Sequence, residues 1–161
     1  MGKAKLPSTG ALRALRAAKL DFAVHQYSYE SRGGTSVSSR ELGVDESAVI
    51  KTLIFETQDK KPLIVLMHGT MEVSTKSLAR HLGLKAIQPC SPEIAQKHSG
   101  YLVGGTSPFG TKKKLPIYAE KSIFELDTIY INGGQRGLLV AIKPEALDQL
   151  LDVERVEVGN I

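Results

Sequence analysis

The sequence contains no tryptophan and a single cysteine, Cys90, among 161 residues. One cysteine cannot form a disulfide within the chain, which excludes a disulfide-stabilised secreted domain and indicates a reducing compartment. No segment approaches the roughly 18 consecutive apolar residues of a membrane-spanning helix. Met1 to Thr9 also lacks the apolar core of a signal peptide. We therefore expect a cytoplasmic protein with no part in a membrane.

Metal-ligand patterns are missing as well. The four histidines are His25, His68, His81 and His98. None has a second histidine, cysteine or carboxylate at the spacing of a metal site, so each is interpreted as a surface or structural residue. Cys90 has neither a base nor a positive charge in its flanking sequence, and it is interpreted as an inert thiol at the end of a short strand. We expect no metal and no cofactor.

The chain does have enough material for one folded domain. Its length and 42% hydrophobic share can build a full core for a single domain, expected to span 1–161, but not for two. A net charge of +4 and a pI near 9.2 describe a mildly basic protein that can attract an acidic polymer without wrapping around it. Many proteins of this charge never touch nucleic acid, so charge alone assigns no function.

Helical and strand patterns alternate along the chain. The expected helices run from a Ser8 or Thr9 cap through Lys19, from a Ser36 cap to Gly43, from Ser74 to Gly83, from Ser91-Pro92 to Gly100, and from Pro144 onward. The expected strands are Phe22–Tyr29, Ile50–Glu56, Leu63–His68, Tyr101–Val103, Ile117–Ala119, Thr128–Asn132 and Leu138–Ile142. This mixture predicts an α+β domain around one substantial sheet.

The most distinctive segment is the loop GGTSPFG from Gly104 to Gly110, which lysines follow at 112–114. Three glycines and a proline preset a tight loop whose backbone N–H groups a ligand can approach. The lysines favour a ligand with phosphate or developing negative charge. A nucleotide P-loop is excluded because Thr111 follows the last glycine, and a nucleophile elbow because Phe109 stands where glycine is required. An ordinary surface turn with solvated lysines stays open.

Lys51 is the side chain that the strand pattern singles out. A period of two places it on one face with Leu53 and Phe55, while Ile50 and Ile54 lie on the opposite face. Both faces therefore look largely buried. A lysine in such a strand is costly unless it meets an anion or lines a wet cavity. The alternative is a lysine that extends its charge from the strand end into solvent.

A second candidate is Arg136, in the glycine-rich turn 133–137 between two expected strands. The glycines chiefly satisfy turn geometry with positive φ. Arg136 either solvates this turn or aims its guanidinium at a phosphate, for which its planar fork is well shaped.

Three motifs carry a resemblance to a known family. They are VIKTL at 49–53, VGGTSPFGTKKKLP at 103–116 and YINGGQRG at 130–137. Together they resemble the YbaK/EbsC family of freestanding aminoacyl-tRNA deacylases, relatives of the editing domain of bacterial prolyl-tRNA synthetases. The similarity keeps its order over nearly the whole chain, which makes it more specific than any one motif. It implies a curved, partly barrel-like mixed β-sheet flanked by helices.

The resemblance also implies roles for the matched residues. Catalytic roles are implied for Lys51, Gly104 and Tyr27. Substrate binding is implied for Gly105, Thr106, Ser107, Pro108, Gly110 and Arg136, and contacts with tRNA phosphates for Lys112, Lys113 and Lys114. Leu139 departs from the family, because some members have an acidic residue there, so no carboxylate role transfers and the substrate preference stays open.

The implied function is the removal of a mischarged small amino acid, most of all cysteine, from tRNA(Pro). An aminoacyl ester is already activated, so positioning and oxyanion stabilisation can supply much of the acceleration without a catalytic triad. Prolyl-tRNA synthetase is the implied partner in tRNA selection, because the chain has no recognisable RNA-binding module such as an RNP motif. The alternatives are an alanine-specific enzyme, a non-catalytic binder of nucleotides or RNA 3′ ends, and a hydrolase of small esters.

Overall fold

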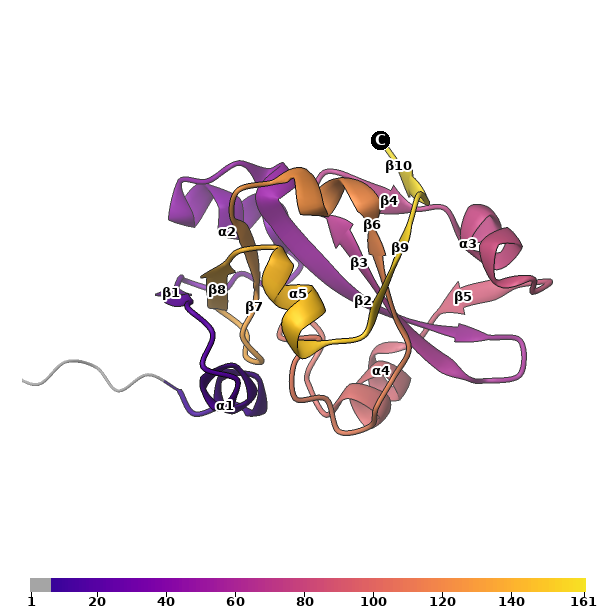
Figure 1. Cartoon of the computed structure of the whole chain (residues 1–161), viewed down its shortest axis with the longest axis horizontal. Helices are drawn as coiled ribbons and strands as arrows, with labels where there is room; N and C mark the ends of the chain where they lie inside the picture. The colour runs from indigo at the N-terminus through magenta and orange to yellow at the C-terminus, as the bar shows by residue number, and fades with distance from the viewer. Residues whose placement is uncertain (1–6) are drawn as a thin grey trace, which may run out of the picture.

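The computed structural model describes residues 7–161, which form a mixed sheet flanked by helices (Figure 1). The helices are α1 (Gly10–Ala17), α2 (Gly34–Leu42), α3 (Thr75–Leu82), α4 (Pro92–Ser99) and α5 (Glu145–Leu150), with the 3-10 helices η1 (Glu46–Ala48) and η2 (Lys121–Glu125). The strands are β1 (Ala23–Gln26), β2 (Val49–Thr57), β3 (Pro62–His68), β4 (Glu72–Val73), β5 (Ile87–Pro89), β6 (Ile117–Glu120), β7 (Ile129–Asn132), β8 (Leu138–Ile142), β9 (Val153–Val156) and β10 (Gly159–Asn160). In this described part of the chain, no helix is long and apolar enough to cross a membrane.

The main sheet has eight strands in the order β1-β8-β7-β2-β3-β6-β9, with β5 added to β2. β2 pairs antiparallel with β3 and parallel with β7, so the sheet is mixed. It curves without closing, since β1 and β9 stay at its two ends. A second, two-stranded sheet joins β10 to β4. The prediction of an α+β fold with a curved mixed sheet is confirmed.

Local capping residues determine where several helices begin and end. Thr9, Ser74 and Ser91 are N-caps whose side chains accept a hydrogen bond from the backbone N–H three residues later. Gly83 and Gly100, with φ of +69° and +82°, end α3 and α4 in the left-handed conformation. These boundaries follow from the sequence alone and are confirmed.

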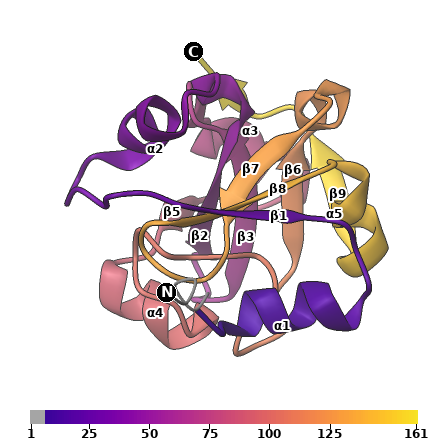
Figure 2. The same cartoon turned by 90° about the vertical axis from the view of Figure 1, so that its left-hand side faces the viewer.

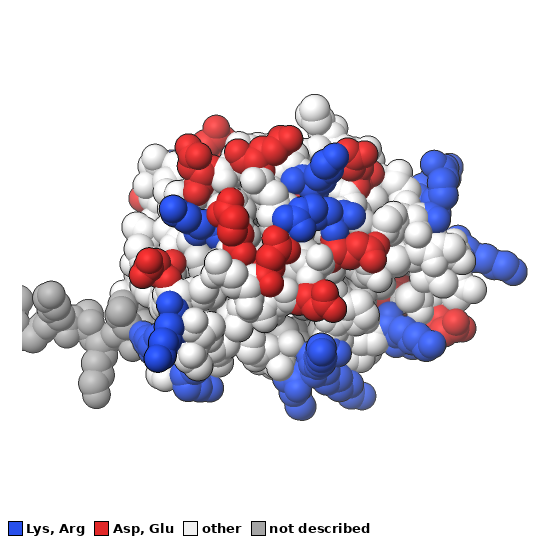
Figure 3. Space-filling view, in the orientation of Figure 1, with Lys and Arg blue, Asp and Glu red and all other residues white. Residues whose placement is uncertain are grey.

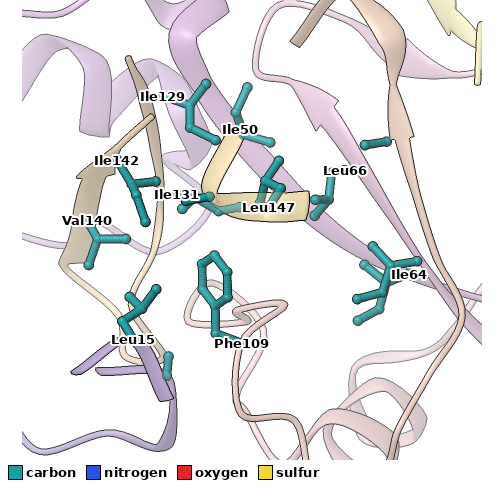
Figure 4. Close-up of a cluster of buried hydrophobic side chains, with 14 of the residues drawn as sticks. Leu15, Ile50, Ile64, Leu66, Phe109, Ile129, Ile131, Val140, Ile142 and Leu147 are labelled. Atoms are coloured by element: carbon teal, nitrogen blue, oxygen red, sulfur yellow. The ribbon is translucent and has the colours of Figure 1, made fainter. Parts of the chain in front are cut away.

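Side chains of β2 enter two hydrophobic clusters, one on each face of the sheet. In the larger cluster, Leu15 of α1 and Leu147 of α5 pack with side chains of the central strands (Figure 4). In the smaller one, Phe55 packs in the same cluster as Leu78 of α3. Each buried side chain of this size contributes about 1.5–3 kcal/mol. β2 is therefore held from both sides, and this holds the backbone that carries Lys51.

The glycine-rich loop is anchored in the larger cluster by Phe109. This ring is fully buried and lies between Leu15, Ile131 and Leu147 in Figure 4. The carbonyl of Phe109 accepts a hydrogen bond of 2.6 Å from the hydroxyl of Tyr101. The second half of the loop is thus part of the core rather than a surface turn.

Two expected helix boundaries are wrong. Ser36 does not cap α2, which begins at Gly34, two residues before Ser36, and has Gly33 as an N-cap without a side-chain hydrogen bond. The helix expected through Lys19 ends at Ala17, and Lys19 itself has φ of +57°, a conformation that cannot continue a right-handed helix.

The strand expected at Tyr101–Val103 is also wrong. The hydroxyl of Ser99 accepts a hydrogen bond of 3.1 Å from the backbone N–H of Tyr101, and the chain turns there instead of extending. Conversely, β4, β9 and β10 were not expected. β9 carries Glu154 and Arg155 side by side, and β4 and β10 have two residues each, so none shows a clear alternation.

Candidate active site

A cavity of about 720 Å³ lies over β2 and is lined by residues of α2 and α4. Figure 2 shows these two helices on the same side of the molecule, with β2 and β5 between them. The remaining walls come from the chain after β1, the loop at 103–106 and the turn at 132–136. The volume falls within the range of about 300–1,000 Å³ that small-molecule sites occupy.

The cavity exists because β2 changes partners along its length. On the edge opposite β3, β2 pairs with β7 at Val49 and Ile50, and with β5 from Phe55 to Thr57. In the described chain, residues 51–53 have no partner strand on this edge, and all three line the cavity. The divergence of β5 from β7 therefore opens a gap in the sheet at Lys51.

Lys51 lines the cavity, as expected for a lysine on an otherwise apolar strand. Its ammonium donates a hydrogen bond to the carbonyl of Met71 and lies 3.6 Å from Oε1 of Glu72. The Lys51 side chain is only 19% exposed, whereas that of Glu72 is 85% exposed. An ion pair with a solvated carboxylate contributes at most about 1 kcal/mol. The ammonium is thus oriented but not neutralised by a buried anion.

Gly104 brings the loop backbone to the cavity wall. It has φ of +90°, and a Cβ at this position would lie 2.7 Å from the hydroxyl oxygen of Tyr29. Its carbonyl accepts a hydrogen bond of 3.1 Å from Nδ2 of Asn132. Oδ1 of Asn132 in turn accepts one of 2.6 Å from the N–H of Gly134. Asn132 therefore ties the loop to the glycine-rich turn, and glycine is required where the two meet Tyr29.

Arg136 closes the same corner of the cavity. Its Nε donates a hydrogen bond of 2.9 Å to the carbonyl of Val103. Its guanidinium carbon lies 5.2 Å from the centre of the Tyr29 ring, within the range of a cation–π contact. No carboxylate pairs with Arg136 anywhere in residues 7–161. It thus keeps the donors with which a guanidinium binds phosphate.

Tyr27 and Leu139 form a less polar part of the wall. Tyr27 is half-buried, and its N–H donates a hydrogen bond of 2.9 Å to the carbonyl of Gly137. Burial raises the pKa of the Tyr27 phenol above its ordinary value, so this hydroxyl stays protonated and can donate to a ligand. Leu139 is 4% exposed and lines the cavity with an apolar side chain. No carboxylate contacts a ligand from this position.

Cys90 follows β5, as predicted, but it also lines the cavity. Burial, followed by the nearby carboxylate of Glu56, raises the pKa of its thiol to about 11. A thiol with this pKa is protonated at neutral pH, and the thiolate is the nucleophilic form. The position of Cys90 therefore places a neutral thiol in the wall rather than a nucleophile.

The histidines lie outside the cavity lining. His68 is buried, with Nδ1 2.6 Å from the carbonyl of Ser47 and Nε2 2.7 Å from the hydroxyl of Ser122. His81 pairs with Glu154 at the surface. Among residues 7–161, no group of three potential metal ligands comes together.

Four residues with an implied substrate-binding role lie outside the lining: Gly105, Ser107, Pro108 and Gly110. The N–H of Gly105 donates a hydrogen bond of 2.8 Å to the carbonyl of Leu102, and a Cβ there would lie 2.7 Å from the backbone N of Arg136. Ser107 and Pro108 are buried beside Phe109, and Gly110 packs against the carbonyl of Gly10. These four residues shape the loop. Thr106 does line the cavity, and its hydroxyl donates to the carbonyl of Leu102 at 3.3 Å.

The lysines at 112–114 are exposed and lie beyond the C-terminal end of α4, outside the cavity lining. The N–H of Lys112 donates a hydrogen bond of 2.9 Å to the carbonyl of Ser99, and Nζ of Lys113 lies 3.3 Å from Nδ1 of His98. The first residues of α4, Pro92 and Ala95, line the cavity. α4 therefore extends from the cavity wall to the segment that carries these lysines.

The opposite side of the molecule is rich in carboxylates. In Figure 2, α5 and β9 lie on the right, away from α2 and α4, and Figure 3 shows many acidic side chains on that α5 face. The exposed acidic residues from η2 to β9 are Glu125, Asp127, Glu145, Asp148, Asp152 and Glu154. Lys121, Lys143 and Arg155 are exposed in the same stretch, so this face has a mixed charge with an excess of carboxylates.

Sequence reasoning did not single out Tyr29 and Asn132 as site residues. Tyr29 follows Tyr27 by two residues, and a shared face of an extended chain was a signal that could have found it. Asn132 lies within the motif at 130–137, but its role depends on a loop 28 residues away in sequence. Glu30 and Arg32, in the polar segment before α2, also line the cavity.

The fold and the site define a small α+β domain with one side-chain-lined cavity over its central strand. Cations and backbone groups meet in it, while its single thiol is protonated. The family model for the aminoacyl-tRNA editing domain matches residues 34–150, and the chain belongs to this family. The resemblance seen in the three sequence motifs is thereby confirmed.

Two individual relatives agree with this assignment in sequence, and one solved structure agrees with the fold. The chain is 26% identical over 151 residues to a candidate Cys-tRNA(Pro)/Cys-tRNA(Cys) deacylase, EbsC, of Enterococcus faecalis, covering 93% of this chain and 92% of that protein. It is 31% identical over 124 residues to the proline–tRNA ligase of Ligilactobacillus salivarius, covering 74% of this chain but 22% of the ligase. The crystal structure of a candidate trans-editing enzyme for prolyl-tRNA synthetase matches with a TM-score of 0.82 at 19% identity, covering 97% of this chain and 100% of that one.

Proposed function

We propose that this chain is a freestanding aminoacyl-tRNA deacylase that removes a mischarged small amino acid, most of all cysteine, from tRNA(Pro). The observation that carries the proposal is the cavity, which brings the Lys51 ammonium, the Arg136 guanidinium and the Gly104 backbone to one ligand space. Membership of the editing-domain family supports it, and so does the deacylase activity after which the EbsC relative is named.

In the proposed complex, the 3′-terminal adenosine and its aminoacyl group occupy the cavity. Lys51 contacts the terminal phosphate or the ribose, and Tyr27 donates a hydrogen bond to the substrate. Because the N–H of Gly105 is bonded to Leu102, the donors assigned to the ester oxygen are the N–H groups of Gly104 and Thr106. One such oxyanion donor typically contributes about 2.7–4 kcal/mol to transition-state stabilisation. Gly105, Ser107, Pro108 and Gly110 contribute by holding the loop in shape.

The nucleophile in this proposal comes from the substrate or from water. With cysteine as the aminoacyl group, its thiol sulfur attacks the ester carbonyl carbon and forms a cyclic thiolactone. The bond between that carbon and the ribose oxygen breaks, and the thiol proton passes to the departing oxygen. With alanine, which has no thiol, water has to attack instead. The protonated state of Cys90 agrees with a mechanism that uses no enzyme thiol.

The limited selectivity of a synthetase explains why a separate editing site is needed. One methylene group discriminates between amino acids by only about 1–3 kcal/mol, so a synthetase pocket for proline admits smaller amino acids. A separate cavity that accepts the smaller product corrects the error. We propose that prolyl-tRNA synthetase supplies the tRNA selection and that the reaction takes place in the cytoplasm.

The decisive experiment is a deacylation panel with tRNA(Pro) charged with cysteine, alanine, serine or proline, and tRNA(Cys) charged with cysteine. We expect fast release of cysteine from tRNA(Pro) and none of proline. Fast release of alanine alone would indicate an alanine-specific enzyme. Equal hydrolysis of free aminoacyl-adenosine would indicate a small-ester hydrolase, and binding without turnover would indicate a nucleotide or RNA 3′-end binder.

Cys90→Ser is expected to keep turnover within about twofold of wild type. The thiol is protonated at neutral pH, so its replacement by a hydroxyl removes no thiolate. For the same reason, the turnover rates of the wild-type protein and of Cys90→Ser should depend on pH in the same way between pH 7 and 9. Initial rates of both proteins across this pH range test the expectation. A folded Cys90→Ser protein without activity would require an enzyme thiol and refute the mechanism.

Replacing Lys112, Lys113 and Lys114 together with glutamine is expected to weaken tRNA binding about tenfold or more at low salt and to flatten the salt dependence. Single-turnover rates at saturating tRNA should stay unchanged, because these lysines lie outside the cavity lining. Filter binding at several salt concentrations measures the first effect.

The matched control has the same change in net charge. Lys61, Lys76 and Lys85 are exposed and lie outside the cavity lining, so their replacement with glutamine should leave tRNA binding close to wild type. Equal weakening by both triple variants would show a nonspecific charge effect. A loss of single-turnover rate with unchanged binding would assign the lysines at 112–114 to chemistry instead.

A further inference from the structure

The Lys51 ammonium is oriented by a short segment that lies outside its own strand pair. It donates to the carbonyl of Met71 and pairs with Glu72, at the beginning of β4. β4 has two residues, and its partner in the second sheet is β10, with Gly159 opposite Val73 and Asn160 opposite Glu72. A two-stranded ladder of this length is marginal in water without further support.

Glu120 supplies support for β10. This residue, at the end of β6, is 7% exposed. One of its carboxylate oxygens accepts a hydrogen bond of 2.7 Å from the N–H of Val158, and the other accepts one of 3.0 Å from the N–H of Gly159. Hydrogen bonds to a buried carboxylate are stronger than neutral ones and are costly to lose. The carboxylate therefore fixes the backbone at the start of β10.

The approach of β10 to β4 leaves no room for a side chain. A Cβ at Gly159 would lie 2.5 Å from Cε of Met71 and 2.6 Å from Oε2 of Glu120. On the other side of the contact, the N–H of Ser74 donates a hydrogen bond of 2.7 Å to the carbonyl of Val158. Residues 71–74 are thus packed between the C-terminal strand and Lys51. Figure 1 shows β10 beside β4 at one edge of the molecule.

We propose that Glu120 is a positioning residue for Lys51. Its carboxylate holds β10, β10 holds β4, and β4 presents the Met71 carbonyl and the Glu72 carboxylate that orient the ammonium. Glu120 itself is not part of the cavity lining, so it acts without touching the substrate. The effect on turnover rests on the proposed function, whereas the effect on the Lys51 ammonium does not.

Two variants and one control test this chain of contacts. Glu120→Gln keeps the shape of the side chain but sets an amide NH2 group against one of the two backbone donors. A chain that ends after Val158 removes β10 and leaves the carboxylate in place. A chain that ends after Asn160 is the matched control, because it removes only Ile161, which is fully exposed at 109%.

The measurements are kcat and KM for deacylation, the 15N–1H resonance of the Lys51 ammonium, and amide hydrogen exchange at 71–74. The resonance is assigned by its absence in Lys51→Met. We expect Glu120→Gln and the chain ending after Val158 to shift or broaden this resonance and to speed exchange at 71–74. Misplacement of a binding group by about 1 Å can cost on the order of 100-fold in rate, so kcat should fall roughly tenfold to 100-fold with a smaller change in KM. The control should match wild type.

An unchanged Lys51 resonance in both folded variants would overturn the proposal, whether or not kcat falls. A shifted resonance with wild-type kcat would overturn the part that concerns turnover. If Glu120→Gln does not fold, the chain ending after Val158 decides. If wild-type protein deacylates none of the charged tRNAs, the proposed function fails, while the resonance and the exchange still test whether Glu120 positions Lys51.

Discussion

Replacing Lys51 with alanine is expected to lower kcat for deacylation by at least about 100-fold, the size of effect seen when one preorganised electrostatic contact is removed. The substitution removes the ammonium from the open edge of β2 and leaves apolar neighbours such as Leu53. Stability should change little, because the ion pair with exposed Glu72 contributes at most about 1 kcal/mol. Turnover and circular dichroism measured on the same preparation check both statements.

The controls separate charge from packing. Lys51→Met keeps most of the apolar stem and should lose as much activity as Lys51→Ala, whereas Lys51→Arg should retain part of it. Lys60→Ala is the matched control, because Lys60 also forms an ion pair with a glutamate, at 3.5 Å, but has a 70% exposed side chain and lies outside the cavity lining. Near-normal turnover in folded Lys51→Ala would remove Lys51 from the proposed site.

Gly104→Val is expected to abolish measurable deacylation, with a loss of at least about 100-fold in kcat/KM. A β-branched residue is strained at φ of +90°, and its Cβ would lie 2.7 Å from the hydroxyl oxygen of Tyr29. The valine would also occupy the space through which the substrate ester approaches the loop backbone. Rates under single-turnover conditions, together with the midpoint of urea unfolding, measure the two effects.

Gly83→Val is the matched control for backbone strain. Gly83 has φ of +69°, and a Cβ there would meet nothing within 4 Å, so this variant carries strain without a steric contact. Both variants should lose about 1–2 kcal/mol of stability for a non-glycine residue in the left-handed region, and the contact with Tyr29 adds its cost only in Gly104→Val. Only Gly104→Val should lose activity. If both lose activity equally, strain or instability explains the result and the loop backbone has no direct part in the reaction.

Gly105→Val is expected to behave differently from Gly104→Val. Its Cβ would lie 2.7 Å from the backbone N of Arg136 and 2.9 Å from the backbone C of Gln135, which cannot move aside like a side chain. The main effect should therefore be on folding, with a lower unfolding midpoint and a poor yield of native protein. A stable but inactive Gly105→Val protein would instead give this residue a direct role.

The sequence predicts those parts of the fold that depend on neighbours along the chain. The N-caps at Ser74 and Ser91 and the C-terminal glycines of α3 and α4 were predicted because a cap is satisfied within a few residues. The two long strands β2 and β3 were predicted because each is a run of mostly apolar residues, rich in Ile, Leu and Val. The short strands β4 and β10 could not be predicted, since they depend on contacts between segments more than 80 residues apart.

For the site, the sequence predicts which residues are unusual but not how they meet. Lys51 is unusual on an apolar strand, and Gly104 is unusual in a loop with a fixed shape. The cavity, however, arises from the divergence of β5 and β7 along β2, and this depends on the pairing of distant segments. Tyr29 was not predicted as a site residue because its contacts are with Gly104 and Arg136, which lie far away in sequence.

The burial of Phe109 has a thermodynamic consequence for ligand binding. A loop that is already ordered by the core does not lose much conformational freedom when a ligand arrives, and ordering a backbone residue costs about 1–2 kcal/mol. The entropy of the glycine-rich loop is therefore lost during folding and not during binding. Trimming the anchor, for example with Phe109→Leu, should shift part of that entropy loss to the binding step. Calorimetry would then show a less favourable entropy of association, even for a ligand that makes the same contacts.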